Sequence, residues 1–458
     1  MNRVFFAILF VLLPAAAGAD DRPNVLFLFA DDQRPDTIAA LGNDVIKTPN
    51  LDRIANNGFV FNNAYCMGAT MGAVCNPSRH QVMSGMSLFR YKNADPKSTW
   101  GAVMRAAGYT TWHVSKNGNT AKVAHKEFEH SSYLNDSQAR TGGEQGKDAA
   151  DRAITFLDNG WNQEKPLFMY IGFAGPHDPR GAGKWADLYK REEIPLPLNY
   201  KPFHPFDNGE MVVRDEKLEL WPRTEDAVRQ HIHDYYGCIS SIDANIGRVL
   251  AKLEEQGELE NTVVIFSADH GLAVGSHGLF GKQSVYEHSM GAPMMFMGPG
   301  IEKGRSEAFA YLYDLFPTAC DFAGVDAPTG LDGKSLAPVI RSESEAVRDT
   351  VFLAYRDVQR AVRRGDWKLI RYPKVDVTQL FHLSKDPDEL TNLAENPEYA
   401  AKVEEMMALL TEQQAEFDDK VPLIVENPKP AKVTVESLTA LAAAEAKRPK
   451  KPRQPKAK

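Results

Sequence analysis

The chain has 458 residues, of which 43% are apolar and 25% charged, and its formal net charge is −8. These values are typical of a folded globular protein and give no reason to expect a nucleic-acid partner. The length fits one large domain with a smaller one, or three small domains.

The first 19 residues have the pattern of a secretory signal peptide. Arg3 precedes an apolar run from Val4 to Leu13, and small residues end at Ala17-Gly18-Ala19, which predicts cleavage before Asp20. The run is too short to span a bilayer, so we expect no transmembrane anchor. The protein is therefore expected to be exported, to the periplasm or the extracellular space.

Short apolar runs with strand composition alternate along the chain with helical patterns. The expected strands are 24–30, 109–114, 167–173 and 262–268, and the expected helices include 148–158 and 239–253. This order predicts an α/β fold with a large, mostly parallel sheet sandwiched by helices. We assign residues 20–327 to this domain.

Ionisable residues follow each expected strand, which predicts one polar site along the carboxyl edge of the sheet. Asp31 and Asp32 follow the first strand, and Asp269 and His270 follow the last. Three carboxylates at one place would repel each other, and a bound cation such as Ca²⁺ or Mg²⁺ resolves that repulsion. Taken alone, Asp31-Asp32 is equally compatible with capping of the next helix.

Cys75 lies in the stretch VCNPSRHQVMSG (74–85), at the expected start of a helix. Pro77 suits the first turn of a helix, and Arg79 carries a guanidinium suited to oxyanions. Cys75 is either a small buried apolar residue or the nucleophile of a site that transfers a tetrahedral oxyanion. Further cationic donors expected at this site are Lys116, His177 and Lys282.

The pattern changes after about residue 328. Residues 328–424 are expected to form a smaller α+β subdomain, with a hairpin over 360–370, a strand at 380–383 and a helix over 397–417 capped by Asn396. Residues 425–458 turn to Pro, Lys and Ala, and the last twelve hold seven basic residues and no acid. We expect this tail to have little fixed structure, and a role in binding polyanions stays open. Four cysteines are too few for a disulfide framework, although one bridge is compatible with the sequence.

The stretch Cys75-Asn76-Pro77-Ser78-Arg79, followed by Ser84-Gly85, resembles the Cys-x-Pro-Ser-Arg pattern of the type I sulfatases, formylglycine-dependent members of the alkaline phosphatase superfamily. The resemblance runs from about Arg22 to Leu393. It implies that a maturation enzyme oxidises Cys75 to formylglycine and reads the Pro-Ser-Arg sequence. It also implies an alkaline phosphatase-like fold.

The same resemblance implies a role for each candidate residue. The metal, Ca²⁺ or alternatively Mg²⁺, would be bound by Asp31, Asp32, Asp269, His270 and the modified Cys75. The sulfate group would be held by Arg79, Lys116, His177 and Lys282, with His177 or Lys282 assisting the leaving oxygen. Hydrated formylglycine would attack sulfur, and its second hydroxyl would later expel sulfate. The expected substrate is a sulfated carbohydrate.

The sequence departs from this family at two positions. His270 stands where many members have asparagine, and Gly118 stands where the family usually has a histidine that contacts formylglycine. Either His113, His125 or a nearby asparagine replaces the second histidine, or turnover is impaired. Besides a sulfatase, two alternatives stay open: a phosphonate or phosphodiester hydrolase of the same superfamily, and a binder of sulfated glycans without turnover.

Overall fold

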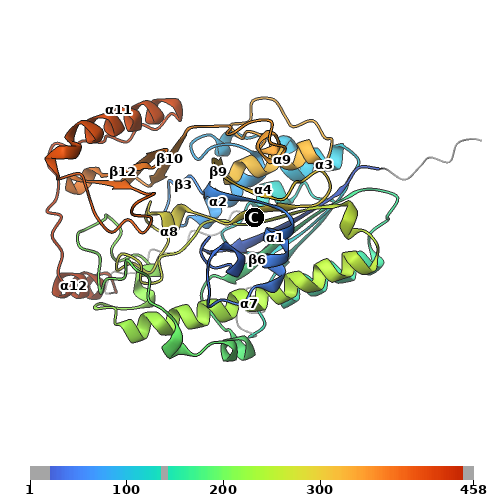
Figure 1. Ribbon diagram of the computed structural model, residues 1–458, viewed down its shortest axis with the longest axis horizontal. Coiled ribbons are helices and arrows are strands. Elements are labelled where there is room, and N and C mark those ends of the chain that lie inside the picture. The colour runs from blue at the N-terminus through green and yellow to red at the C-terminus, as the bar shows by residue number, and fades with distance from the viewer. Residues whose placement is uncertain (1–20, 136–142, 447–458) are drawn as a thin grey trace, which may run out of the picture.

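The computed structural model describes residues 21–135 and 143–446 (Figure 1). The expected signal peptide, residues 1–19, lies outside this part of the chain. Within the described residues no helix combines the length and the apolar composition that crossing a membrane requires. All four cysteines are described, buried and free, so the single disulfide that the sequence allowed is absent.

A large sheet forms the centre of the molecule, with its strands in the order β5-β4-β6-β1-β7-β8-β2-β9. The strands span β1 Asn24–Asp31, β2 Phe59–Tyr65, β4 Thr110–Lys116, β5 His130–Leu134, β6 Leu167–Pro176, β7 Thr262–Ala268, β8 Met294–Met297 and β9 Gly304–Tyr311. Strand β8 runs antiparallel to β7 and β2, whereas the other neighbours pair in parallel. The mostly parallel, mixed sheet is confirmed.

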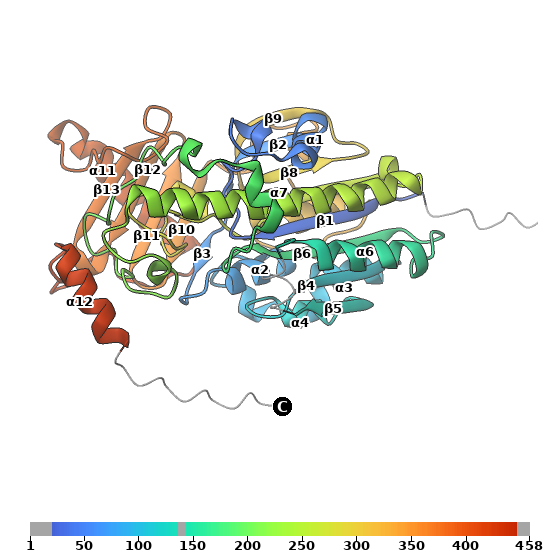
Figure 2. The same cartoon turned by 90° about the horizontal axis from the view of Figure 1, so that it is seen from below.

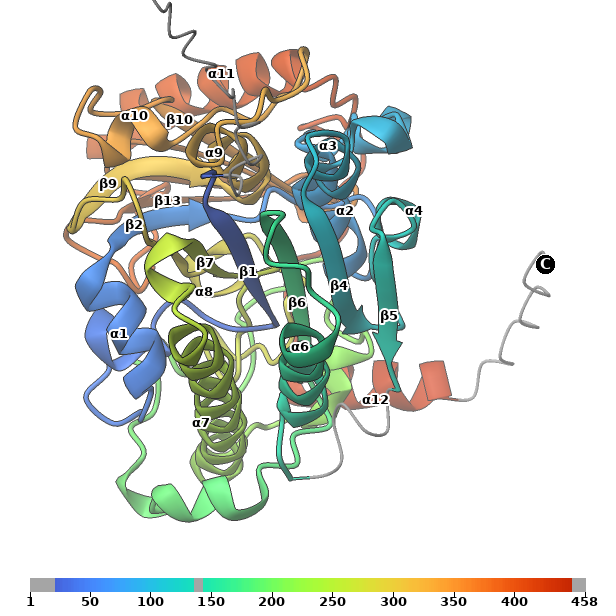
Figure 3. The ribbon, with the colours of Figure 1, turned by 90° about the vertical axis from the view of Figure 1, so that its right-hand side faces the viewer.

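Helices cover both faces of this sheet (Figure 3). They span α1 Pro49–Asn57, α2 Cys75–Ser84, α3 Trp100–Ala106, α4 Lys122–His125, α6 Lys147–Asn159, α7 Glu225–Glu255, α8 Glu287–Met290, α9 Leu315–Phe322 and α10 Ala337–Ile340. Alternate side chains of β1 enter different cores: Phe27 packs with residues of α3 and α9, whereas Leu28 packs with residues of α1, α6 and α7. This period of two is what a strand buried on both faces requires.

A second, smaller sheet belongs to the C-terminal subdomain (Figure 2). Its order is β13-β12-β11-β10-β3, with β3 Gly68–Ala69, β10 Thr350–Tyr355, β11 Gln359–Arg364, β12 Trp367–Tyr372 and β13 Val377–His382. Strand β3 follows β2 of the large sheet in the chain and pairs in parallel with β10 at the edge of the small sheet, so the chain passes directly from one sheet to the other here. The helix α11, Ala400–Glu416, packs on β10, β11 and β12. The expected α+β subdomain is therefore present, and the Asn396 side chain caps the 3-10 turn that precedes α11.

Residues 425–446 differ from the sequence-based expectation, because they have fixed structure. Helix α12 spans Val435–Ala446 and buries Leu438, and the backbone N–H of Asp207 donates to the carbonyl of Ala431 at 2.7 Å. The reason is local: Thr434 and Ser437 cap a run of good helix formers that follows the Pro/Lys stretch. Residues 447–458 lie outside the described chain.

A buried ion cluster also links the subdomain to the large domain. Lys368 on β12 is fully buried, and its Nζ lies 2.8 Å from Glu287 at the start of α8 and 2.8 Å from Glu389. Burial raises the pKa of Glu389 to about 7, although the charge of Lys368 opposes this rise. Tyr65 donates to the other oxygen of Glu287 at 2.6 Å. Lys368 therefore compensates two carboxylates from different parts of the chain.

We expect Lys368→Met to lower the free energy of unfolding by about 3 kcal/mol, because it leaves Glu287 and Glu389 without their shared cation. Urea denaturation followed by circular dichroism measures the change. Lys374→Met is the matched control, since Lys374 pairs with Asp357 on the same subdomain but both side chains are exposed, and it should cost about 1 kcal/mol or less. Equal losses in the two variants would contradict this account.

Candidate active site

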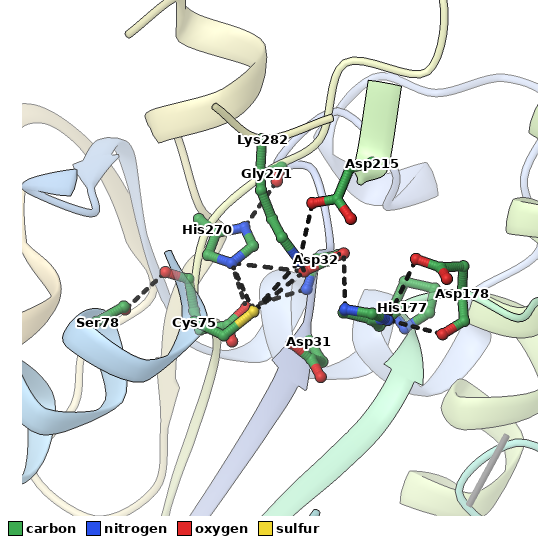
Figure 4. Close-up of polar contacts among 12 residues, drawn as sticks. Asp31, Asp32, Cys75, Ser78, His177, Asp178, Asp215, His270, Gly271 and Lys282 are labelled. Carbon is green, nitrogen blue, oxygen red and sulfur yellow. Dashed lines mark hydrogen bonds and ion pairs between the residues drawn. The ribbon is translucent and has the colours of Figure 1, made fainter. Parts of the chain in front are cut away.

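The structure brings the predicted site residues together at the carboxyl edge of the large sheet (Figure 4). Asp31 is the last residue of β1 and Lys116 the last of β4, while His177 directly follows β6 and Asp269 directly follows β7. Cys75 is the first residue of α2, whose N-terminus meets this edge. The expectation that the strand ends converge is confirmed by this geometry.

Five buried residues each offer one ligand atom within 4.8 Å of the others: Asp31, Asp32, Cys75, Asp269 and His270. These donors fit a hard divalent cation, because three of them are carboxylates. Oδ1 of Asp31 is buried and has no hydrogen-bond partner among the described residues, which is the state expected of an oxygen that serves a cation. Its nearest ion-pair partner is Nη2 of Arg79, at 3.8 Å.

The imidazole of His270 is oriented toward the same point. Nδ1 lies 2.8 Å from the carbonyl of Gly271, to which it donates, so the Nε2 lone pair is left for the cluster. Nε2 is 3.3 Å from Sγ of Cys75 and 3.4 Å from Asp32. A carbonyl that fixes the tautomer in this way is a common feature behind metal-ligating histidines.

Asp32 takes an unusual backbone conformation that two contacts hold in place. Its φ of 67° lies in the left-handed region, which non-glycine residues seldom adopt. Its N–H donates to Oδ1 of Asp269 at 3.0 Å, and the hydroxyl of Tyr235 on α7 donates to its carbonyl. Such a conformation persists only where its surroundings hold it, and it turns the Asp32 side chain toward Lys282 and Cys75.

Three buried cations balance the three carboxylates. Lys116 donates to Asp31, and Nζ of Lys282 lies 2.7 and 2.9 Å from the two oxygens of Asp32 and 3.3 Å from Sγ of Cys75. Nε of Arg79 donates to Oδ2 of Asp269 at 3.0 Å. Arg79 therefore forms ion pairs with the carboxylates of Asp269 and Asp31.

His177 is the remaining predicted site residue, and its imidazole lies beside Asp32. Its Nδ1 lies 2.7 Å from the carbonyl of Asp178, and its Nε2 lies 3.9 Å from Oδ2 of Asp32. Burial lowers the pKa of His177, and the charge of Lys282 lowers it further. The imidazole is therefore mainly neutral at pH 7.

The cations keep the carboxylates ionised despite their burial. Burial alone would raise the pKa of Asp31, but the charges of Lys116 and Arg79 bring it well below its usual range. The pKa of Asp32 is lowered in the same manner, against burial, mainly by Lys282. The site is thus a set of fixed anions ready to receive a cation.

The thiol of Cys75 behaves differently. Burial raises its pKa well above the usual value, and the charges of Lys116 and Lys282 offset this rise only in part. Because the thiolate is the nucleophilic form of cysteine, an unmodified Cys75 is a poor nucleophile at neutral pH. The side chain is only 1% exposed, as a buried apolar residue would be. Its contacts with Asp32, His270 and Lys282 are polar, however, which disfavours that interpretation.

The proposed replacements for the histidine missing at Gly118 have other contacts. The two nitrogens of His113 lie 3.0 and 2.9 Å from the hydroxyls of Ser131 and Ser115. The ring of His125 lies against that of His113, tilted by 34° with the centroids 3.9 Å apart, and both rings pack on Tyr170. Among the histidines of the described chain, it is His270 that contacts Cys75, with Nε2 3.3 Å from Sγ.

Several contributors were not identified from the sequence. Ser78 donates to the carbonyl of Asp269 at 2.7 Å, and Tyr170 accepts from Arg79 at 3.1 Å. Asp178 and Asp215 lie beside His177 and Lys282 (Figure 4). Asp178 directly follows the predicted site residue His177 in the chain, whereas Asp215 lies in a long segment without periodicity.

Comparison with known proteins gives a consistent result. The family model described as Sulfatase matches residues 23–325, more than half of the chain, and the model described as N-sulphoglucosamine sulphohydrolase, C-terminal, matches residues 275–416. An N-acetylglucosamine-6-O-sulfatase from Bacteroides thetaiotaomicron is 28% identical, with 88% of each chain covered. An arylsulfatase K from Rattus norvegicus is also 28% identical, covering 84% of this chain and 77% of that protein.

Solved structures share the fold. One, in complex with D-glucosamine-2-N,6-O-disulfate, has a TM-score of 0.72 at 24% identity and covers 88% of this chain and 99% of its own. A phosphonate monoester hydrolase from Agrobacterium radiobacter has a TM-score of 0.72 at 22% identity, covering 86% and 96%. With the match of the family model, these findings show that the chain belongs to the sulfatase family and is a sulfuric ester hydrolase.

Proposed function

We propose that the protein hydrolyses a sulfate ester on a carbohydrate, with formylglycine made from Cys75 and a divalent cation, Ca²⁺ in preference to Mg²⁺. The observation that supports this most is the buried convergence of three carboxylates and His270 on Cys75, ringed by three cations. A solvent-excluded set of fixed charges stabilises developing charge without reorganisation, which is what oxyanion transfer needs.

The cation would be held by Asp31, Asp32, Asp269, His270 and residue 75, which are the residues that offer converging ligand atoms. When bound, it supplies Lewis-acid polarisation, and formylglycine supplies a hydroxyl nucleophile that the Cys75 thiol cannot. The preference for Ca²⁺ follows from the carboxylate-rich donor set, and His270 is its least usual member.

The charges of the site make sulfate binding depend on the cation. Three aspartates balance Arg79, Lys116 and Lys282, so the cluster has no net charge when His177 and His270 are neutral. A divalent cation would give it two positive charges, which favours a sulfate monoester anion. Lys116 and Lys282 would then be free to turn from Asp31 and Asp32 toward the sulfate oxygens.

The neutral His177 and the charged Lys282 both lie beside Asp32, and we place the leaving ester oxygen next to them. Lys282 carries protons to donate at neutral pH, because its carboxylate neighbours raise its pKa well above the usual value although burial lowers it. We therefore assign Lys282 to protonation of the leaving oxygen and His177 to its orientation.

Two parts of this proposal come from outside the site. The signal-like sequence of residues 1–19 supports export to the periplasm or the extracellular space. The Cys-x-Pro-Ser-Arg sequence supports maturation by a formylglycine-generating enzyme, which would act before folding because Cys75 and Arg79 are fully buried. A carbohydrate substrate is supported by the relative named N-acetylglucosamine-6-O-sulfatase and by the neighbour solved with a disulfated glucosamine.

A phosphonate or phosphodiester hydrolase is the second candidate, favoured by the fold shared with the phosphonate monoester hydrolase. Matched assays on an aryl sulfate, an aryl phosphodiester and an aryl phosphonate decide between the two. We expect sulfate release to have the highest kcat/KM. A higher value on either phosphorus ester would assign the chain to the second activity.

Cys75→Ala is expected to abolish sulfate release, since the variant has no side chain from which formylglycine can form. The measurement is sulfate release from an aryl sulfate by protein produced together with a maturation enzyme. Cys320→Ala is the matched control, because Cys320 is also fully buried but lies on α9, and it should keep activity. Substantial turnover by Cys75→Ala would refute the formylglycine proposal.

Chelator-treated protein is expected to bind Ca²⁺, and binding should raise the free energy of unfolding by about 2.7 kcal/mol at a hundredfold excess over Kd. Isothermal calorimetry gives the Kd, and Asp31→Asn should weaken it at least about tenfold by removing a ligand charge. Asp226→Asn, at an exposed carboxylate, is the control and should leave the Kd unchanged. A protein that binds neither Ca²⁺ nor Mg²⁺ would contradict the proposed site.

A further inference from the structure

Arg214 is an exposed cation that reaches two buried acids of the site. Its Nη1 donates to Oδ1 of Asp178 at 2.8 Å and to Oδ1 of Asp215 at 2.6 Å, and its Nη2 donates to the second oxygen of Asp178. The Arg214 side chain is 59% exposed, whereas those of Asp178 and Asp215 are 11% and 7% exposed. The guanidinium therefore lies where the buried site meets solvent.

The two acids connect Arg214 to the groups that would handle the leaving oxygen. Asp178 follows His177 in the chain, and its carbonyl accepts from His177 Nδ1 (Figure 4). Asp215 lies 4.0 Å from Nζ of Lys282. One aspartate thus separates Arg214 from each of these two groups: Asp178 lies between Arg214 and His177, and Asp215 lies between Arg214 and Lys282.

The segment that carries Arg214 is fixed to the same loop as Lys282. Gln283 donates to Oδ2 of Asp215 at 2.6 Å. The next residue, Glu216, is buried and accepts from the backbone N–H groups of Phe280 and Gly281. These contacts are made by residues on both sides of Lys282 in the chain. They therefore hold the segment of Arg214 in a fixed position relative to Lys282.

The charges around Arg214 disfavour a substrate that carries a carboxylate beside the sulfated position. Its one positive charge is shared by two carboxylates, so the group of three has a net charge of −1. A carboxylate on the substrate would compete with Asp178 and Asp215 and would be repelled by them. Hydroxyl groups meet no such cost, since they can donate to the aspartates and accept from the guanidinium at once.

We propose that Asp178 and Arg214 bind the sugar ring that bears the sulfate, and that they select rings with hydroxyl groups and no carboxylate beside the sulfated position. This inference rests on the proposed sulfatase function and adds the class of sugar that the site accepts. Neutral hexoses and N-acetylhexosamines belong to this class, and uronic acids do not.

The test compares Arg214→Lys with wild-type protein on two kinds of substrate. One is an aryl sulfate, which has no sugar hydroxyls, and the other is the best substrate among galactose and N-acetylglucosamine monosulfates. Lysine keeps the charge that Asp178 and Asp215 need but not the bidentate geometry. We expect kcat/KM to fall at least about tenfold further on the sugar sulfate than on the aryl sulfate, because only the sugar has hydroxyl groups for Arg214 to bind.

Arg341→Lys is the matched control, because Arg341 forms a similar, partly exposed ion pair with Asp321 away from the site, and it should change neither value. Equal losses on both substrates would show that Arg214 only supports the fold, and no loss on either would overturn the proposal. Wild-type protein should also prefer the neutral sugar sulfates over a 2-sulfated glucuronate. The reverse preference would likewise overturn it.

A binding measurement separates this inference from the proposed function. In the Cys75→Ala background, calorimetry with the same sugar monosulfates should show weaker binding when Arg214 is replaced by lysine. If wild-type protein released sulfate from no substrate, the proposed function would fail, and this measurement would still decide whether Arg214 binds the sugar. Unchanged affinity would overturn the role of Arg214.

Discussion

The balance between three buried carboxylates and three buried cations is the constraint on which the site depends. Asp31, Asp32 and Asp269 could not share a solvent-excluded volume without compensation, and Lys116, Lys282 and Arg79 supply it. The same cations hold the pKa values of Asp31 and Asp32 well below their usual range despite burial. Under the proposed function, the balance would also make the charge available to a sulfate ester depend on the bound cation, so that metal and substrate binding would be coupled through one set of charges.

The fold maintains this balance from several elements at once. Parallel strands deliver acids and bases to one edge of the sheet, and α2 brings Cys75 to the same edge. The loop between β7 and β8 carries both Asp269 and Lys282, and it ends at Glu287, where the C-terminal subdomain contributes Lys368. The subdomain is thus tied directly to the loop that holds the proposed proton donor.

The sequence predicted the features that depend on short patterns. Apolar runs ending in acids located β1 and β7, and the Cys-x-Pro-Ser-Arg sequence located Cys75 at the start of α2. It could not reveal contacts between distant, aperiodic segments: Asp215 and Tyr235 reach the site only through folding. The helix α12 was not predicted, because the Pro- and Lys-rich residues on either side of it led us to expect little fixed structure throughout residues 425–458.

The most direct test of the account is the mass of the tryptic peptide that contains Cys75, taken from active protein purified from its native host. Burial raises the pKa of the Cys75 thiol well above its usual value and so makes the unmodified side chain a poor nucleophile, and the account predicts an aldehyde or its hydrate at position 75. Active protein in which this peptide carries an unmodified thiol would contradict the account, because some other group would then have to attack the ester.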